Sequence, residues 1–110
     1  MAKQKEQMLV IHTNALPGDV RQAIIAAKNS LRVRLPGRSS IFQNRPPVLP
    51  NLDDGCQYFE FDVGEARPGD PQGQRGSRRL VIEVVTKARQ VREIYFTDQH
   101  YTSGSFRRVL

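Results

Sequence analysis

The feature that most constrains the fold is the alternation of apolar and polar residues in the second half of the chain. Successive side chains of an extended strand point to opposite faces, so alternation is typical of a strand buried on one face. In the segment YFEFDV, residues 58–63, one face carries Phe59, Phe61 and Val63, and the other carries Tyr58, Glu60 and Asp62. The segment 77–85 places Leu80, Ile82 and Val84 on one face in the same way. Residues 91–97 and 105–110 are predicted to form further strands.

One segment has helical spacing instead. In residues 16–31 the apolar side chains recur three or four positions apart, at Val20, Ile24, Ala27 and Leu31. Pro17 near the start and Asp19 in the first turn are typical of a helix N-terminus. A short apolar run at residues 8–13 is predicted to be an edge strand. The sequence therefore predicts an α+β fold, with one main N-terminal helix packed on an antiparallel β-sheet of about five strands, and with the other face of the sheet bare.

The length limits the number of domains. A chain of 110 residues can form one compact domain and is too short for two. We expect residues 1–7 to be a disordered N-terminal segment and residues 8–110 to form a single domain. Cys56 is the only cysteine, so no internal disulfide is possible. No apolar run approaches the roughly 20 residues of a membrane span, and the start of the chain shows no signal peptide.

The charge of the chain indicates the class of its partner. The formal net charge is +6, and the 17 basic residues are 13 arginines and 4 lysines. A guanidinium can bind two oxygens of a phosphate at once, whereas an ammonium is a point charge. A polyanionic partner, above all nucleic acid, is therefore favoured over a basic surface that is merely soluble.

Several polar side chains are predicted to lie together on the sheet face that the helix leaves open. They come from three consecutive strands, as Glu60 and Asp62, then Arg75 and Arg79, then His100 and Tyr101. This set holds a candidate general base, a candidate general acid, two groups that can bind an anion, and an aromatic ring on which a nucleobase can stack. Each also has a plain structural explanation. A cross-strand Glu–Arg pair is commonly only a surface salt bridge, and a lone histidine before a tyrosine in a loop, as at His100, is commonly exposed and not catalytic. We expect the same of His12 in the predicted edge strand.

Four segments, in this order along the chain, resemble the microbial guanyl-specific ribonucleases, the family of barnase and its small relatives. IFQNRPPVLP resembles the guanine-binding loop of that family, and YFEFDV resembles the strand that carries its catalytic glutamate. RGSRRLVI is similar to its paired-arginine segment, and YFTDQHYTSGSF to its closing motif with the catalytic histidine. The likeness extends from ALPGDV to the C-terminus.

The resemblance implies a role for each matching residue. Glu60 would be the general base that takes the ribose 2′-hydroxyl proton, and His100 the general acid that protonates the leaving 5′-oxygen. Arg75 and Arg79 would bind the phosphate as charge develops on it. The substrate-binding residues would be Phe42, Gln43, Asn44, Arg45 and Tyr101. The product would be a 2′,3′-cyclic phosphate formed 3′ to guanosine in single-stranded RNA, with no metal and no cofactor.

One departure from the family pattern bears on base recognition. The family has a glutamate after the loop arginine, where it accepts hydrogen bonds from guanine, and this chain has Pro46 there, followed by Pro47. Proline has no side-chain acceptor, so we expect a weaker or broader base preference.

Two other functions stay open from the sequence. A basic RNA-binding domain could keep the fold without catalysis, and the same ribonuclease chemistry could serve as a toxin domain paired with an acidic inhibitor similar to barstar. We expect a monomer that binds single-stranded RNA and no membrane. The resemblance implies secretion or export, although this chain shows no signal peptide.

Overall fold

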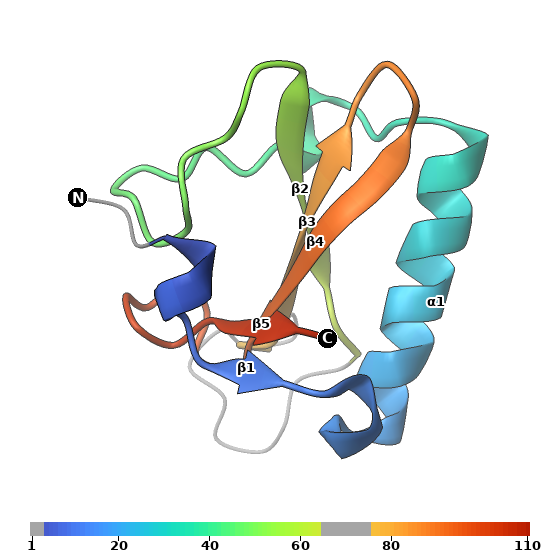
Figure 1. Ribbon diagram of the computed structural model, residues 1–110. Coiled ribbons are helices and arrows are strands. Elements are labelled where there is room, and N and C mark those ends of the chain that lie inside the picture. The colour runs from blue at the N-terminus through green and yellow to red at the C-terminus, as the bar shows by residue number, and fades with distance from the viewer. Residues whose placement is uncertain (1–3, 65–75) are drawn as a thin grey trace.

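The structure is a computed structural model that describes residues 4–64 and 76–110. It has one long helix, α1 (Gly18–Val33), and a five-stranded sheet in the order β1-β5-β4-β3-β2. The strands are β1 (Val10–Ile11), β2 (Cys56–Asp62), β3 (Arg79–Val85), β4 (Gln90–Thr97) and β5 (Arg107–Val109). Single turns of 3-10 helix occur at η1 (Lys5–Gln7), η2 (Thr13–Ala15) and η3 (Arg38–Ser40). The predicted α+β fold is confirmed: α1 lies along one side of the sheet (Figure 1). No helix in the described ranges is long and apolar enough to span a membrane.

The sheet is mixed, not wholly antiparallel as expected. Strands β2, β3, β4 and β5 pair with one another antiparallel. Strand β1 pairs with β5 in parallel, through Val10 with Arg108 and Ile11 with Val109. The predicted edge position of β1 is confirmed. Its direction could not be predicted because a pairing of two residues leaves no pattern in the sequence. The expected disorder of residues 1–7 stays a prediction, although Lys5–Gln7 form η1.

The main core lies between α1 and the sheet, as predicted. The buried residues of the helix are Val20, Ile24, Ala27 and Leu31. They belong to one cluster with the inward-facing residues of the strands, which include Phe59, Leu80, Ile82, Val84, Ile94 and Phe96. Each fully buried side chain of this size contributes about 1.5–3 kcal/mol to folding. The apolar residues whose spacing predicted the helix and strands are thus the residues that pack in the main core.

The opposite face of the sheet is also covered, which corrects the expectation of a bare face. Tyr58, Val81 and Tyr95 of the sheet are buried there under a second apolar cluster. The residues that cover them come from outside the strands and are Met8, Phe42, Leu49 and Phe106. In Figure 1 the segment that leads from η3 into β2 lies across the sheet from α1. Periodicity could not reveal this layer, because apolar residues in irregular segments have no repeating face.

The two adjacent arginines at the start of β3 point to different parts of the molecule. Arg79 pairs with Asp62 of β2 and is described with the site below. The Arg78 guanidinium lies 2.6 Å from the Asp19 carboxylate in the first turn of α1, and its side chain is only 7% exposed. Gly64 lies against this ion pair with a left-handed φ of 60°. Arg78 therefore ties the N-terminus of the helix to one end of the sheet.

Gly64→Ala should destabilise the protein more than an alanine at a comparable turn. A Cβ at Gly64 would lie 2.6 Å from Nη2 of Arg78 and 3.2 Å from Oδ2 of Asp19. The left-handed backbone alone costs an L-residue about 1–2 kcal/mol. We expect a loss beyond that in the free energy of unfolding, measured by urea denaturation.

Two other glycines separate the two contributions. Gly104 has a φ of 80° and open space at its Cβ position, so Gly104→Ala should show the backbone cost alone. Gly37 has open space and no left-handed φ, so Gly37→Ala should show no loss. Equal losses at Gly64 and Gly104 would contradict the tight packing against the Arg78–Asp19 pair.

Candidate active site

Glu60 and Tyr101 meet on the side of the sheet away from α1. Glu60 lies in β2, opposite Val81 of β3, and Tyr101 lies in the connection between β4 and β5. The Tyr101 hydroxyl donates a hydrogen bond of 2.9 Å to Oε2 of Glu60. The two predicted site residues, 41 positions apart, are therefore in direct contact.

Arg79 is a buried charge with a fixed orientation. Its side chain is 1% exposed, and Nε lies 3.0 Å from Oδ1 of Asp62, its cross-strand neighbour. Its Nη1 donates to the carbonyls of Gly76 and Arg78, each at 2.8 Å. The cross-strand ion pair of Arg79 is thus made with Asp62, and its guanidinium is buried, unlike that of a surface salt bridge. The same bonds hold the guanidinium at the end of the strand that carries Glu60. Arg75, the second predicted phosphate ligand, lies outside the described residues.

His100 is held by its backbone beside Tyr101. Its N–H donates to the carbonyl of Ser77 at 2.7 Å, and its φ of 57° lies in the left-handed region. The His100 and Tyr101 rings are 4.4 Å apart between centroids. Tyr101 thus contacts both the candidate acid and the candidate base. His12 is exposed, as expected.

Tyr101 also belongs to an aromatic cluster that joins the site to the second apolar cluster. Its ring lies 5.0 Å from that of Phe42 at an interplanar angle of 30°, and 6.3 Å from that of Phe106. Burial, followed by the hydrogen bond to Glu60, raises the pKa of Tyr101 well above its ordinary value. The phenol therefore stays protonated, and able to donate, far into the alkaline range.

The predicted base-binding loop, residues 42–45, is braced by one of its own side chains. Oδ1 of Asn44 accepts hydrogen bonds from the N–H groups of Val48 and Leu49, and Nδ2 donates to the Leu49 carbonyl. The φ of Asn44 is 56°, a conformation that asparagine adopts more readily than most residues. The side chain of Asn44 is thus used within the loop, which leaves the exposed Gln43 and Arg45 to face solvent. The sequence did not reveal this bracing, although the dipeptide Pro46–Pro47 is a turn signal.

A pocket of about 530 Å³ lies between this loop and β2. All four predicted loop residues line it, and Tyr58 and Gln57 of β2 form part of its other wall. Pro47 also lines it.

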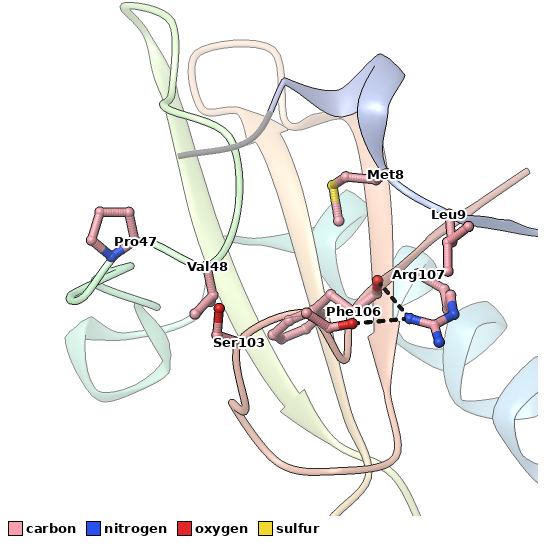
Figure 2. Close-up of a pocket in the computed structure, with 8 residues that line it drawn as sticks. Met8, Leu9, Pro47, Val48, Ser103, Phe106 and Arg107 are labelled. Atoms are coloured by element: carbon pink, nitrogen blue, oxygen red, sulfur yellow. Dashed lines mark hydrogen bonds between the residues drawn. The ribbon is translucent and has the colours of Figure 1, made fainter. Parts of the chain in front are cut away.

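A smaller cavity of about 140 Å³ is also lined by Pro47 (Figure 2). Met8, Val48 and Phe106 surround it, and Arg107 turns back to donate to the carbonyl of Phe106 at 3.2 Å. No predicted site residue lines this cavity. Since it holds neither a carboxylate nor a histidine, it supplies no acid or base for the chemistry.

The described residues contain no cluster of three or more histidine, cysteine, aspartate or glutamate side chains that could hold a metal ion. The site thus presents a carboxylate, an imidazole, a phenol and a buried guanidinium. These groups can take a proton, give a proton and bind an anion.

Comparison with known proteins gives the family. A family model described as ribonuclease matches residues 2–109. The chain is also similar to the crystal structure of ribonuclease Sa2 with guanosine-2′-cyclophosphate. That similarity has a TM-score of 0.60 and 27% identity over 94% of this chain and 96% of that one. A second structure, of ribonuclease Sa2 complexes with mononucleotides, has a TM-score of 0.60 at 24% identity, over 94% of each chain, and shows the fold. No curated protein sequence matches significantly.

The chain belongs to the ribonuclease family, the group of small microbial guanyl-specific ribonucleases that its motifs resemble. It is a ribonuclease, and RNA is its binding partner.

The tyrosines give a test of this buried arrangement. The pKa values of all three, Tyr58, Tyr95 and Tyr101, are raised, in each case chiefly by burial. In the unfolded chain they should ionise near pH 10. The folded protein therefore keeps protons that the unfolded chain loses. Its free energy of unfolding should be unaffected by these groups below about pH 10 and should fall above it.

An ultraviolet titration combined with circular dichroism measures this. We expect tyrosinate to appear only together with unfolding, and Tyr101→Phe should remove about one third of its final amplitude. A tyrosine that ionises near pH 10 in the folded protein would contradict the burial described above.

Proposed function

We propose that this ribonuclease cleaves single-stranded RNA by transphosphorylation, with Glu60 as the general base and His100 as the general acid. The observation that carries the proposal is the contact of Tyr101 with both residues, at 2.9 Å from the Glu60 carboxylate and 4.4 Å between the two rings. A base and an acid must lie on either side of the reacting phosphate, and groups from β2 and from the β4–β5 connection can do so.

The proposed reaction proceeds in one displacement. Glu60 takes the proton of the ribose 2′-hydroxyl as that oxygen attacks phosphorus. The bond to the 5′-oxygen breaks, and His100 gives that oxygen its proton. The products are a 2′,3′-cyclic phosphate and a free 5′-hydroxyl. No step in this scheme needs a metal ion.

Arg79 would stabilise the charge that develops on the phosphate. A guanidinium that is already oriented by Asp62 and two carbonyls needs no rearrangement when the charge appears, and such preorganised groups are commonly the largest contribution to catalysis. Arg75 would be the second such group, as its place in the RGSRR segment implies.

Recognition of guanosine would depend on the backbone of the loop 42–45. Ribonuclease Sa2 has been solved with guanosine-2′-cyclophosphate, which supports a guanosine site in this fold. In this chain the Asn44 side chain is engaged inside the loop, and Pro46 offers no acceptor. The base preference would then rest on main-chain groups and on Tyr101.

The net charge of +6 also supports the expected acidic protein inhibitor, which would bind the surface that binds RNA. Such an inhibitor would place a carboxylate near Arg79, in the position of the phosphate.

Glu60→Gln should abolish most cleavage and leave RNA binding nearly unchanged. The amide keeps the shape of the side chain but cannot take a proton, and positioned proton transfer contributes about 10²–10⁴-fold. The measurement is kcat on a dinucleotide together with the Kd for a short single-stranded RNA. Undiminished turnover would remove Glu60 from the mechanism.

The pH profile of kcat/KM should be bell-shaped, since the reaction needs one ionised carboxylate and one protonated imidazole. His100→Ala should remove the alkaline limb and most of the activity. His12→Ala is the matched control and should change neither. An essential His12 would show that the acid has been misassigned.

Pro46→Glu should increase the preference for guanosine. A carboxylate at this position could accept hydrogen bonds from the base, and an acceptor worth about 1–3 kcal/mol corresponds to about 5–150-fold in discrimination. The measurement is kcat/KM on dinucleotides with G, A, C or U at the 5′ position. A wild-type protein already strict for guanosine, and unchanged by Pro46→Glu, would show that the loop needs no carboxylate.

A further inference from the structure

A chain of hydroxyl hydrogen bonds lies beneath the connection that carries His100 and Tyr101. Oγ1 of Thr97, at the end of β4, lies 2.6 Å from Oγ of Ser105. It also accepts a hydrogen bond of 3.0 Å from the N–H of Gln99. Oγ of Ser105 donates to the carbonyl of Thr102 at 2.6 Å. Thr97 and Ser105 are both buried, at 1% and 7% exposed.

The direction of this chain follows from the number of protons. A serine hydroxyl has one proton, and that of Ser105 is given to the Thr102 carbonyl. The contact between the two hydroxyls must then use the proton of Thr97. Each hydroxyl thus donates once and accepts once. Without the Ser105 hydroxyl the buried Thr97 hydroxyl loses its acceptor, and without the Thr97 hydroxyl the Gln99 N–H loses its acceptor.

The two ends of the chain bracket the site residues. The chain begins at the N–H of Gln99, directly before His100, and ends at the carbonyl of Thr102, directly after Tyr101. The Thr102 hydroxyl closes the loop by donating to the Gln99 carbonyl at 2.7 Å. His100 itself has a left-handed φ of 57°, a conformation that an L-residue keeps only where its surroundings hold it. The bracket therefore acts on the one residue of the loop whose backbone most needs support.

We propose that Thr97 and Ser105 are positioning residues, whose hydroxyl chain holds His100 where it can protonate the leaving oxygen. The inference rests on the proposed role of His100 as general acid. Neither hydroxyl touches the substrate in this proposal. They act through the backbone on either side of His100.

The test compares two substrates that differ in their need for an acid. Cleavage of a dinucleotide expels the 5′-oxygen of the second nucleoside, a poor leaving group that needs a proton from His100. Cleavage of a nucleoside 3′-nitrophenyl phosphate expels nitrophenolate, which is stable without that proton. We expect Thr97→Val to slow kcat on the dinucleotide by about 10²-fold, the effect of a displacement near 1 Å, and to leave the aryl ester within about threefold. Ser105→Ala should do the same. The double variant should be no slower than the slower single variant, because the two hydroxyls act as one unit.

Two controls separate positioning from general loss of stability. Thr97→Ser keeps the hydroxyl and should keep dinucleotide activity within about threefold. Thr86→Val removes a hydroxyl bond to the Gly55 carbonyl at the far end of the sheet, outside the site, and should leave the ratio of the two rates unchanged. All rates are measured at a temperature where circular dichroism shows each variant to be folded.

The outcomes distinguish this inference from the proposed function. Thr97→Val that slows both substrates equally, or neither, would overturn the positioning role. His100→Ala that slows both substrates equally would instead overturn the assignment of the acid. The assignment of the acid would also be overturned if His100→Ala cleaved the dinucleotide as fast as the wild-type protein.

Discussion

The buried guanidinium of Arg79 is the interaction on which the site depends. A charge that is 1% exposed is costly unless it is fully paired, and Arg79 is paired with Asp62 and with two carbonyls of its own segment. The same short segment, residues 76–79, receives the backbone of His100 at Ser77 and ties α1 through Arg78. The segment at the start of β3 thus holds a candidate anion-binding group, bonds the backbone of a candidate acid and anchors the helix. The contacts of this segment hold the candidate site residues in place at the end of the sheet, where several of them lie in connections between strands.

The sequence predicted the helix and strands whose apolar residues recur at a regular period, and it did not predict the buried residues of segments that have no such period. The four buried positions of α1 and the residues of β2 and β3 that face α1 were predicted correctly, because packing of one face against the helix imposes a period. Phe42, Leu49 and Phe106 were not recognised as a second core, since they lie in irregular segments. The alternation assigned Arg79, and not Arg78, to the site, because neighbours in a strand point to opposite faces. It did not predict that Arg78 pairs with Asp19. Thr97 and Ser105 gave no signal, because hydroxyl residues are common wherever a strand meets a turn.

Tyr101 links three parts of the molecule that the sequence treats separately. Its hydroxyl bonds Glu60 of β2, its ring lies against His100, and its other contacts are with Phe42 and Phe106 of the second cluster. Its raised pKa means that this donor is constant over the pH range in which an imidazole titrates. Changes in protonation near neutral pH are therefore left to the groups that would carry the reaction, while the hydrogen bond that orients the carboxylate persists.

If residues 42–45 bind the base as proposed, their packing on the second sheet face ties substrate choice to the stability of the fold. Phe42 is 9% exposed and packs with Tyr58 and Tyr101, so it is at once a core residue and a wall of the pocket beside the loop. A mutation of Phe42 that alters this pocket wall should therefore also alter the free energy of unfolding. Gln43 and Arg45, which face solvent, carry no such penalty. Natural variation in this lineage should therefore explore new nucleotide preferences through the outward positions of the loop first, and reach the inward ones only after stabilising changes elsewhere.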